Sequence, residues 1–214
     1  MTNFLDLDTQ AASQADQRGA YINKTGKYKG KFIKAEALRA DSGTIGVGFT
    51  FESTDKQTVN FSLYIQKADG EKLSAYKQLN AIMACLRIRS ISAPVPMKAK
   101  KYDYTQKKEV EYEAQMLTDL INKPIGILLQ SCEYEKEKNR VKTGEYGWKM
   151  ELYGVFEAST ELTAGEILGK KTTPEVLATL IATLADRPLK NKANQNHAQQ
   201  SSGSSDGFDD MIPF

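Results

Sequence analysis

Apolar and polar residues alternate in three consecutive segments of this chain, residues 27–39, 44–52 and 57–66. A period of two is typical of strands that bury one face. Turn-forming residues separate the segments at 41–43 and at 53–56. The pattern therefore predicts an antiparallel meander of three strands. We expect its core to contain the aromatic side chains Phe32, Phe49 and Phe51.

The apolar period changes to three and four residues between positions 71 and 86, which predicts an amphipathic helix. Pro94 and Pro96 prevent helical continuation, and a basic segment at 98–112 follows as a polar insert. Residues 115–122 are predicted to form one or two helical turns. Two further strands are predicted at 125–134 and 148–156, joined by the polar loop 135–147. Two short helices, 161–168 and 174–184, are predicted to close the body.

Three strands, a helix and two strands are the element order of the OB-fold, a five-stranded barrel with its helix between the third and fourth strands. We therefore predict a mainly β protein with an OB-fold barrel, C-terminal helices and an acidic tail. The expected domains are a flexible N-terminal segment at 1–25, the OB domain at 26–186, and a disordered tail at 187–214. The tail begins with a Gly, Ser, Gln and Asn-rich stretch that is too polar to fold.

Several kinds of chemistry are disfavoured by residue usage. The one histidine, His197, lies in the tail, and the two cysteines, Cys85 and Cys132, fit no C-x-x-C pattern. We expect free buried thiols, no metal, no cofactor and no catalytic residues. The chain has no phosphate-binding Gly-Lys-Ser/Thr loop and no clustered carboxylate motif, which favours binding over catalysis. No segment has the apolar length of a membrane span or the pattern of a signal peptide, so we expect a soluble cytoplasmic protein.

Two segments interleave lysines with aromatic residues, the pattern that single-strand binding requires for phosphates and stacked bases. One is residues 97–108, and the other is the predicted loop 134–148, which in OB-folds contacts oligonucleotides. Lysine-rich loops are also common on ordinary protein surfaces, and the glutamates of the second segment dilute its charge. The DNA-binding candidates are Lys98, Lys100, Lys101, Tyr102, Tyr104, Lys107, Lys136, Lys138, Arg140, Lys142, Tyr146 and Trp148.

The chain finishes on Asp-Asp-Met-Ile-Pro-Phe, an acidic and apolar tip at the end of a polar tether. An apolar pocket with a basic rim is suited to bind such a tip. The sequence closely resembles the C-terminal tip of bacterial single-stranded DNA-binding proteins and of the phage proteins that share it. In that family the tip recruits replication and repair enzymes. The partner-binding candidates are Asp209, Asp210, Ile212, Pro213 and Phe214.

Together with the body, the tip resembles the phage-type single-stranded DNA-binding proteins. The resemblance implies sequence-independent single-strand binding in replication, recombination or repair, in the cytoplasm of an infected bacterial host. It also implies a polymerase, helicase or nuclease as partner, no membrane, and a monomer or homodimer. The alternatives are a single-strand annealing protein or recombination mediator with the same tip, and an adaptor whose β-domain binds protein.

Overall fold

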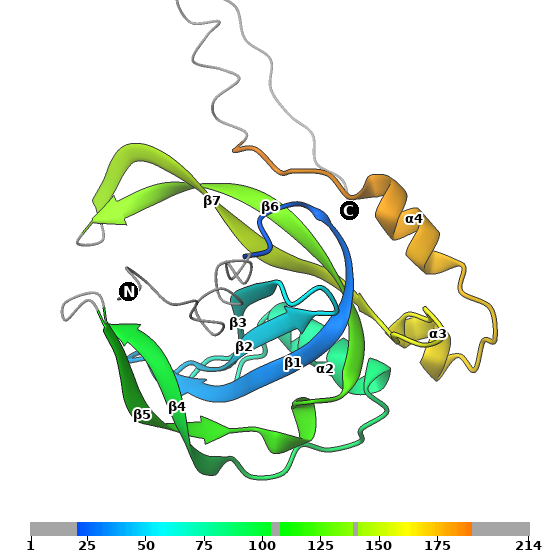
Figure 1. The fold of residues 1–214 in the computed structure, drawn as a ribbon, viewed down its shortest axis with the longest axis horizontal. Coiled ribbons are helices and arrows are strands. Elements are labelled where there is room, and N and C mark those ends of the chain that lie inside the picture. The colour runs from blue at the N-terminus through cyan, green and yellow to red at the C-terminus, as the bar shows by residue number, and fades with distance from the viewer. Residues whose placement is uncertain (1–20, 104–107, 139–140, 190–214) are drawn as a thin grey trace, which may run out of the picture.

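The computed structural model describes residues 21–103, 108–138 and 141–189 (Figure 1). The fold is mainly β, and its ladders are antiparallel. The strands are β1 (Gly26–Arg39), β2 (Ile45–Ser53), β3 (Thr58–Gln66), β4 (Val95–Asp103), β5 (Lys108–Met116), β6 (Pro124–Lys138) and β7 (Val141–Phe156). The helices are α2 (Ala75–Cys85), α3 (Ala164–Leu168) and α4 (Val176–Thr183), with a 3-10 turn, η1 (Thr118–Leu120).

The meander predicted for the first part of the chain is confirmed. β1 pairs with β2 and β2 pairs with β3, in a register that places Phe32 opposite Phe51 and Phe49 opposite Phe61. The predicted core aromatics Phe32, Phe49 and Phe51 are at most 2% exposed, and their rings contact one another. The predicted amphipathic helix is present as α2, which buries Leu79, Ile82 and Cys85. Alternation and helical period therefore identified the elements that build the core.

A closed barrel, which the element order predicted, is not found. β1 pairs with both β2 and β6, and β6 pairs with β7, but β3 and β7 are not paired with each other in the described residues. The Gln78 side-chain amide from α2 donates a hydrogen bond of 2.8 Å to the Leu152 carbonyl of β7. At this position β7 is therefore joined to α2 by a side-chain hydrogen bond, and the described residues form no ladder between β7 and β3. A cavity of about 440 Å³ lies at this opening between β3, the start of α2 and β7.

Two segments that the sequence pattern predicted as a polar insert and a polar loop form extended hairpins instead. The basic insert at 98–112 lies in β4 and β5, and most of the predicted loop 135–147 continues β6 and β7. The helical turns predicted at 115–122 are reduced to η1, because residues 115 and 116 complete β5. In the first hairpin Lys98 lies opposite Glu113 and Lys100 opposite Glu111. Opposite charges in these cross-strand positions stabilise the pairing and give the hairpin a polar composition.

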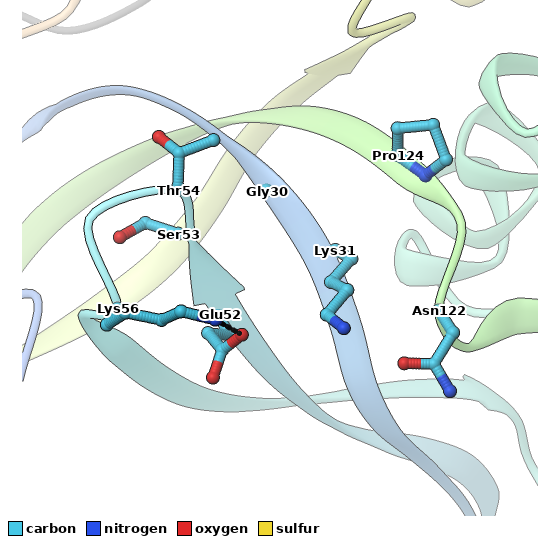
Figure 2. Close-up of a pocket in the computed structure, with 8 residues that line it drawn as sticks. All are labelled: Gly30, Lys31, Glu52, Ser53, Thr54, Lys56, Asn122 and Pro124. Atoms are coloured by element: carbon cyan, nitrogen blue, oxygen red, sulfur yellow. Dashed lines mark hydrogen bonds and ion pairs between the residues drawn. The ribbon is translucent and has the colours of Figure 1, made fainter.

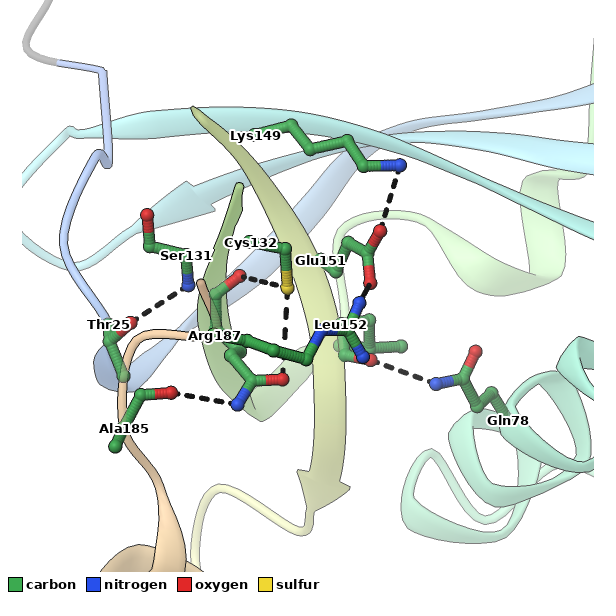
Figure 3. Close-up of polar contacts among 10 residues, drawn as sticks. Thr25, Gln78, Ser131, Cys132, Lys149, Glu151, Leu152, Ala185 and Arg187 are labelled. Carbon is green, nitrogen blue, oxygen red and sulfur yellow. Dashed lines mark hydrogen bonds and ion pairs between the residues drawn. The ribbon is translucent and has the colours of Figure 1, made fainter. Parts of the chain in front are cut away.

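The packed body extends beyond the expected boundaries at 26 and 186. Ile22 is 3% exposed and its N–H donates a hydrogen bond of 2.8 Å to the Thr58 carbonyl. At the other end, Arg187 forms a β-bridge to β6, and its backbone N–H donates a hydrogen bond of 2.8 Å to the Ser131 carbonyl. Figure 3 shows the Thr25 hydroxyl bonded to the Ser131 N–H. The Gln130 side-chain amide donates a hydrogen bond of 2.8 Å to the Ala185 carbonyl. Residues 21–25 and 187–189 therefore belong to the contacts of the body.

The two predicted C-terminal helices are present as α3 and α4, and one buried carboxylate joins them. Glu166 is 2% exposed. Its Oε2 accepts hydrogen bonds of 2.8 Å from the N–H and the hydroxyl of Thr163. The Thr163 side chain in turn accepts a hydrogen bond from the Glu166 N–H, which completes a capping box at the start of α3. Its Oε1 accepts bonds of 2.6 and 2.9 Å from the N–H groups of Glu175 and Val176 at the start of α4. These backbone N–H groups lower the pKa of Glu166 to about 2.

Replacing Glu166 by glutamine is expected to lower the free energy of unfolding by about 2 kcal/mol, since charge-assisted hydrogen bonds to two helix starts are lost. The folded-state pKa lies below the ordinary value of 4.5. The stabilisation is therefore complete above that value and is lost as the pH falls towards about 2. Denaturant unfolding from pH 7 to pH 2.5 measures this, with Glu175→Gln as the control because that exposed carboxylate only pairs with Lys171. An equal effect of both substitutions at pH 7 would contradict the assigned role of Glu166.

The cysteine prediction is confirmed, because Cys85 and Cys132 are both free and buried. Burial, with a smaller contribution from Glu157, raises the pKa of the Cys85 thiol to about 12. Both thiols therefore stay protonated at neutral pH and contribute as small apolar side chains. Over the ranges that the structure describes, no helix has the length and apolar character needed to cross a bilayer.

Candidate nucleic-acid interface

Two hairpins extend from the body and carry most of the predicted DNA-binding residues. We call them the β4–β5 arm (residues 95–116) and the β6–β7 arm (residues 130–150). The free ends of both arms lie at the left of Figure 1. Lys98, Lys100, Lys101 and Tyr102 are on the first arm, and Lys136, Lys138, Lys142, Tyr146 and Trp148 are on the second. Tyr104, Lys107, Arg140 and the partner-binding candidates Asp209, Asp210, Ile212, Pro213 and Phe214 lie outside the described residues.

The strand register divides the lysines of the β4–β5 arm between two faces. Lys98 and Lys100 share one face with Glu113 and Glu111, which lie directly opposite them. Tyr102 follows in the same register, opposite Glu109. Lys101 lies on the other face, opposite Val110. Glutamates on the same face thus neutralise much of the positive charge that the sequence predicts for Lys98 and Lys100. Lys101 has no glutamate directly opposite it.

The face that carries Lys101 contains an aromatic side chain between two lysines. The ammonium group of Lys101 lies 5.0 Å from the centre of the Tyr112 ring, and that of Lys34 on β1 lies 5.1 Å from it. The Tyr112 hydroxyl accepts a hydrogen bond from Lys34 and donates one of 2.7 Å to Glu36. Lys34 and Glu36 also form an ion pair of 2.7 Å. This cluster connects the arm to β1, next to the single β-bridge that joins Glu36 and Met116.

The charge of Lys34 is secured by this cluster. Burial lowers the pKa of its ammonium group, but the hydrogen bonds to Glu36 and Tyr112 outweigh burial and raise the pKa above its ordinary value. Lys34 therefore stays positive at any physiological pH. A flat ring flanked by permanent positive charge is the combination that holds a base and its phosphate.

The same face of the sheet continues across β1, β2 and β3, where two glycines leave room for the side chains of neighbouring strands. Leu38 lies over Gly48, where an added Cβ would come within 3.1 Å of its Cδ1. Tyr64 lies over Gly46 in the same way, with 3.0 Å to a ring carbon. Tyr64 is 44% exposed, so one side of its ring packs against backbone and the remainder is open to solvent. This arrangement provides a second flat aromatic surface on the face that holds Lys34 and Tyr112.

The β6–β7 arm presents its aromatic residues on one face. Tyr146, Trp148 and Met150 alternate along β7, and Met150 packs against the main core. Alternate side chains share a face, so Tyr146 and Trp148 continue the core-facing side of the sheet beyond the end of the core. Trp148 is 53% exposed and Tyr146 is 38% exposed. Rings of this size that remain half open on an extended hairpin are available for stacking.

The charges of the β6–β7 arm are largely paired. Lys136 bonds Glu145 at 3.2 Å and Lys142 bonds Glu135 at 3.3 Å. Both pairs are on the surface, where an ion pair contributes little and a phosphate can replace the carboxylate. Lys138, opposite Val141, is exposed near the end of the arm. We therefore expect the aromatic rings of this arm to contribute more to nucleic-acid binding than its lysines do.

The other face of the β6–β7 arm is covered at its base by the end of the body. Figure 3 shows Arg187 reaching Glu151, which also binds Lys149. The distances are 2.6 Å for Arg187 and 2.9 Å for Lys149. Tyr134 lies on this face, across Gly147 and 5.9 Å from the Lys149 ammonium. The face with Tyr146 and Trp148 is consequently the better candidate for a long ligand.

Three residues of this interface were not among the candidates, namely Lys34, Tyr64 and Tyr112. Lys34 and Tyr112 are brought together across 78 positions of sequence, a contact that no local pattern reveals. The sequence does indicate a strand around Tyr112, because Val110, Tyr112, Ala114 and Met116 alternate with polar residues. The candidates Lys98, Lys100, Lys101, Tyr102, Lys136, Lys138, Lys142, Tyr146 and Trp148 remain predictions.

The described residues contain no group of three or more His, Cys, Asp or Glu side chains placed to hold a metal ion. In comparisons with known proteins, no protein-family model and no curated protein matches the sequence.

Proposed function

We propose that this protein binds single-stranded DNA without sequence preference and recruits other enzymes to it. The observation that carries the proposal is the association of aromatic rings with lysines on the sheet face and the arms, above all the half-buried ring of Tyr112 between Lys34 and Lys101. Base stacking on such rings accepts any base, and lysines neutralise the phosphates. Trp148 and Tyr146 add a second stacking surface on the β6–β7 arm.

The body is best interpreted as an OB-fold with an open seam. In that fold the first strand pairs with both the second and the fourth, the fourth pairs with the fifth, and a helix follows the third strand. β1, β2, β3, α2, β6 and β7 follow this order, and β1 pairs with β2 and β6 as the fold requires. The β4–β5 arm is then an insertion after the helix. Under this interpretation the β6–β7 arm is the loop that contacts oligonucleotides in OB-folds.

The C-terminal tip supports a role in recruitment. Its resemblance to the tip of bacterial single-stranded DNA-binding proteins suggests a polymerase, helicase or nuclease as partner, in replication, recombination or repair. The body contacts extend through residues 187–189, which lie beside β6. The tether to the tip therefore starts next to the β6–β7 arm, so that an enzyme held by the tip is kept close to bound DNA. We propose binding without catalysis for the body itself.

Binding to an unstructured oligothymidylate is expected to be much tighter than binding to duplex DNA of the same length, because only a single strand exposes its bases for stacking. Affinity should fall steeply with salt, with a log–log slope of about −0.7 per phosphate neutralised. Fluorescence anisotropy at two salt concentrations, with single-stranded and duplex forms of one labelled oligonucleotide, measures both properties. Equal or tighter binding to the duplex would refute the proposal.

A further inference from the structure

Three lysines alternate along the first half of β1, on the face that points away from the main core. Lys27, Lys29 and Lys31 lie opposite Leu128, Gly126 and Pro124 of β6. Tyr28, which lies between the first two, packs against the main core instead. Residues two apart on a strand share a face and are about 7 Å apart along it. The three side chains, which we call the β1 lysine row, thus present positive charge at a regular short repeat.

One carboxylate oxygen holds the first two members of the row. Oε1 of Glu161 lies 2.7 Å from the ammonium of Lys27 and 2.7 Å from that of Lys29. Hydrogen bonds from these lysines lower the pKa of Glu161. Glu161 has a φ of 64°, in the left-handed region that residues other than glycine rarely adopt. An anionic oxygen between two ammonium groups is also the position that a phosphate oxygen would take.

The third member of the row has no such partner. The side chain of Lys31 forms no ion pair or hydrogen bond within the part of the chain that the structure describes. Figure 2 shows it at a cavity of about 270 Å³, between the Glu52 and Lys56 side chains and Asn122. The Glu52 carboxylate at this cavity pairs with Lys56 at 3.1 Å and forms no ion pair with Lys31. The Lys31 side chain is partly exposed at this cavity and carries a charge that no described group pairs with, so an anion can bind it.

We propose that the β1 lysine row is a second phosphate-binding site, which takes the backbone of a single strand after it has passed the arms. Glu161 holds Lys27 and Lys29 in the absence of nucleic acid and is displaced when phosphates bind. This inference rests on the proposed function. α3 and α4, which lie near the row, are at the right of Figure 1, whereas the arms end at the left. A strand that reaches both sites must therefore wrap around the body.

A nucleic-acid backbone fits this row better than an acidic peptide strand. β1 pairs with β6 over 26–31 and with β2 from Gly30, so both of its edges are occupied at Lys31. A peptide therefore cannot add to the sheet there through backbone hydrogen bonds, which would supply much of its affinity. Phosphates require only the repeated charge that the row offers, and their contacts are independent of sequence.

The test compares oligothymidylates of about 8 and about 40 nucleotides, because an OB-fold alone contacts roughly 4–16 nucleotides. Glu161→Gln is expected to tighten binding of the long oligonucleotide by about threefold, since the loss of one surface carboxylate frees two lysines. Replacing Lys27, Lys29 and Lys31 together by glutamine should reduce the log–log salt slope for the long oligonucleotide by about 2. Neither change should alter binding of the short one. Lys77→Gln on the exposed surface of α2 is the matched control.

The proposal is overturned if the triple variant, folded by thermal melting, keeps the wild-type salt slope for the long oligonucleotide. It is also overturned if affinity for the short oligonucleotide falls by the same factor, because the row would then belong to the first site. Loss of binding to a peptide of residues 201–214, with unchanged binding of the long oligonucleotide, would assign the row to an acidic protein segment. Failure of the unmodified protein to bind either oligonucleotide would instead refute the proposed function.

Discussion

Replacing Tyr146 and Trp148 together by alanine is expected to weaken binding of an unstructured oligonucleotide by at least about 30-fold, because each stacked base contributes ~1–3 kcal/mol. Both rings lie on the core-facing side of the β6–β7 arm and are partly exposed. Neither belongs to the main core, so the fold should be retained. Equilibrium titration of a labelled oligothymidylate measures the loss, and a thermal melt of the same sample confirms folding.

Tyr134→Ala is the matched control for this double variant. Tyr134 lies on the same arm and is 37% exposed, but it faces the side occupied by Lys149 and Arg187. Its removal should leave DNA affinity within about threefold of the original, because it stacks no base under the proposal. If the double variant binds normally and substitution of Tyr64 or Tyr112 causes the loss, the DNA lies on the sheet face and our placement on the β6–β7 arm is wrong.

The sequence was sufficient for the elements whose apolar residues repeat with a clear period. β2 and β3 alternate cleanly because their inner faces are buried under α2 and the core aromatics. In the two arms, by contrast, most side chains are exposed or half-buried. Opposite charges across the hairpin, as between Lys98 and Glu113, contribute to the pairing, and they give these segments the polar composition of a loop. Periodicity therefore detects burial, and strands that stay in solvent escape it.

Element order also could not determine whether the barrel closes. Closure depends on hydrogen bonds between the edges of β3 and β7, and one carbonyl at that position is used by Gln78 of α2. The position of Gln78 in the sequence does not indicate that its side chain will bind a β7 carbonyl. The candidate site shows the same limit, since the Lys34, Glu36 and Tyr112 cluster forms only when β5 returns beside β1. Residue types along the chain identified the chemistry, whereas the tertiary fold determined which side chains meet.

Removing residues 206–214 is expected to abolish capture of partner enzymes, because the tip supplies the acidic and apolar groups that a basic-rimmed pocket recognises. A pull-down of purified bacterial replication and repair enzymes by the immobilised protein, with and without bound oligonucleotide, measures this. The body should remain folded, since the truncation leaves intact residues 21–189, which include all the strands and helices of the fold.

The matched control for this truncation deletes nine residues of the polar tether, 193–201, and keeps the tip. It shortens the tail equally without removing a carboxylate or an apolar tip residue, so partner capture should persist. Single-strand affinity at low salt should rise in the truncated protein and not in the control, because the acidic residues of the tip compete with phosphates for the lysines of the body under this proposal. Equal capture by the truncated and complete chains would refute the role of the tip. In that case the lysine and aromatic surfaces of the body would have to recruit the partners themselves, and DNA and partner would compete for one interface.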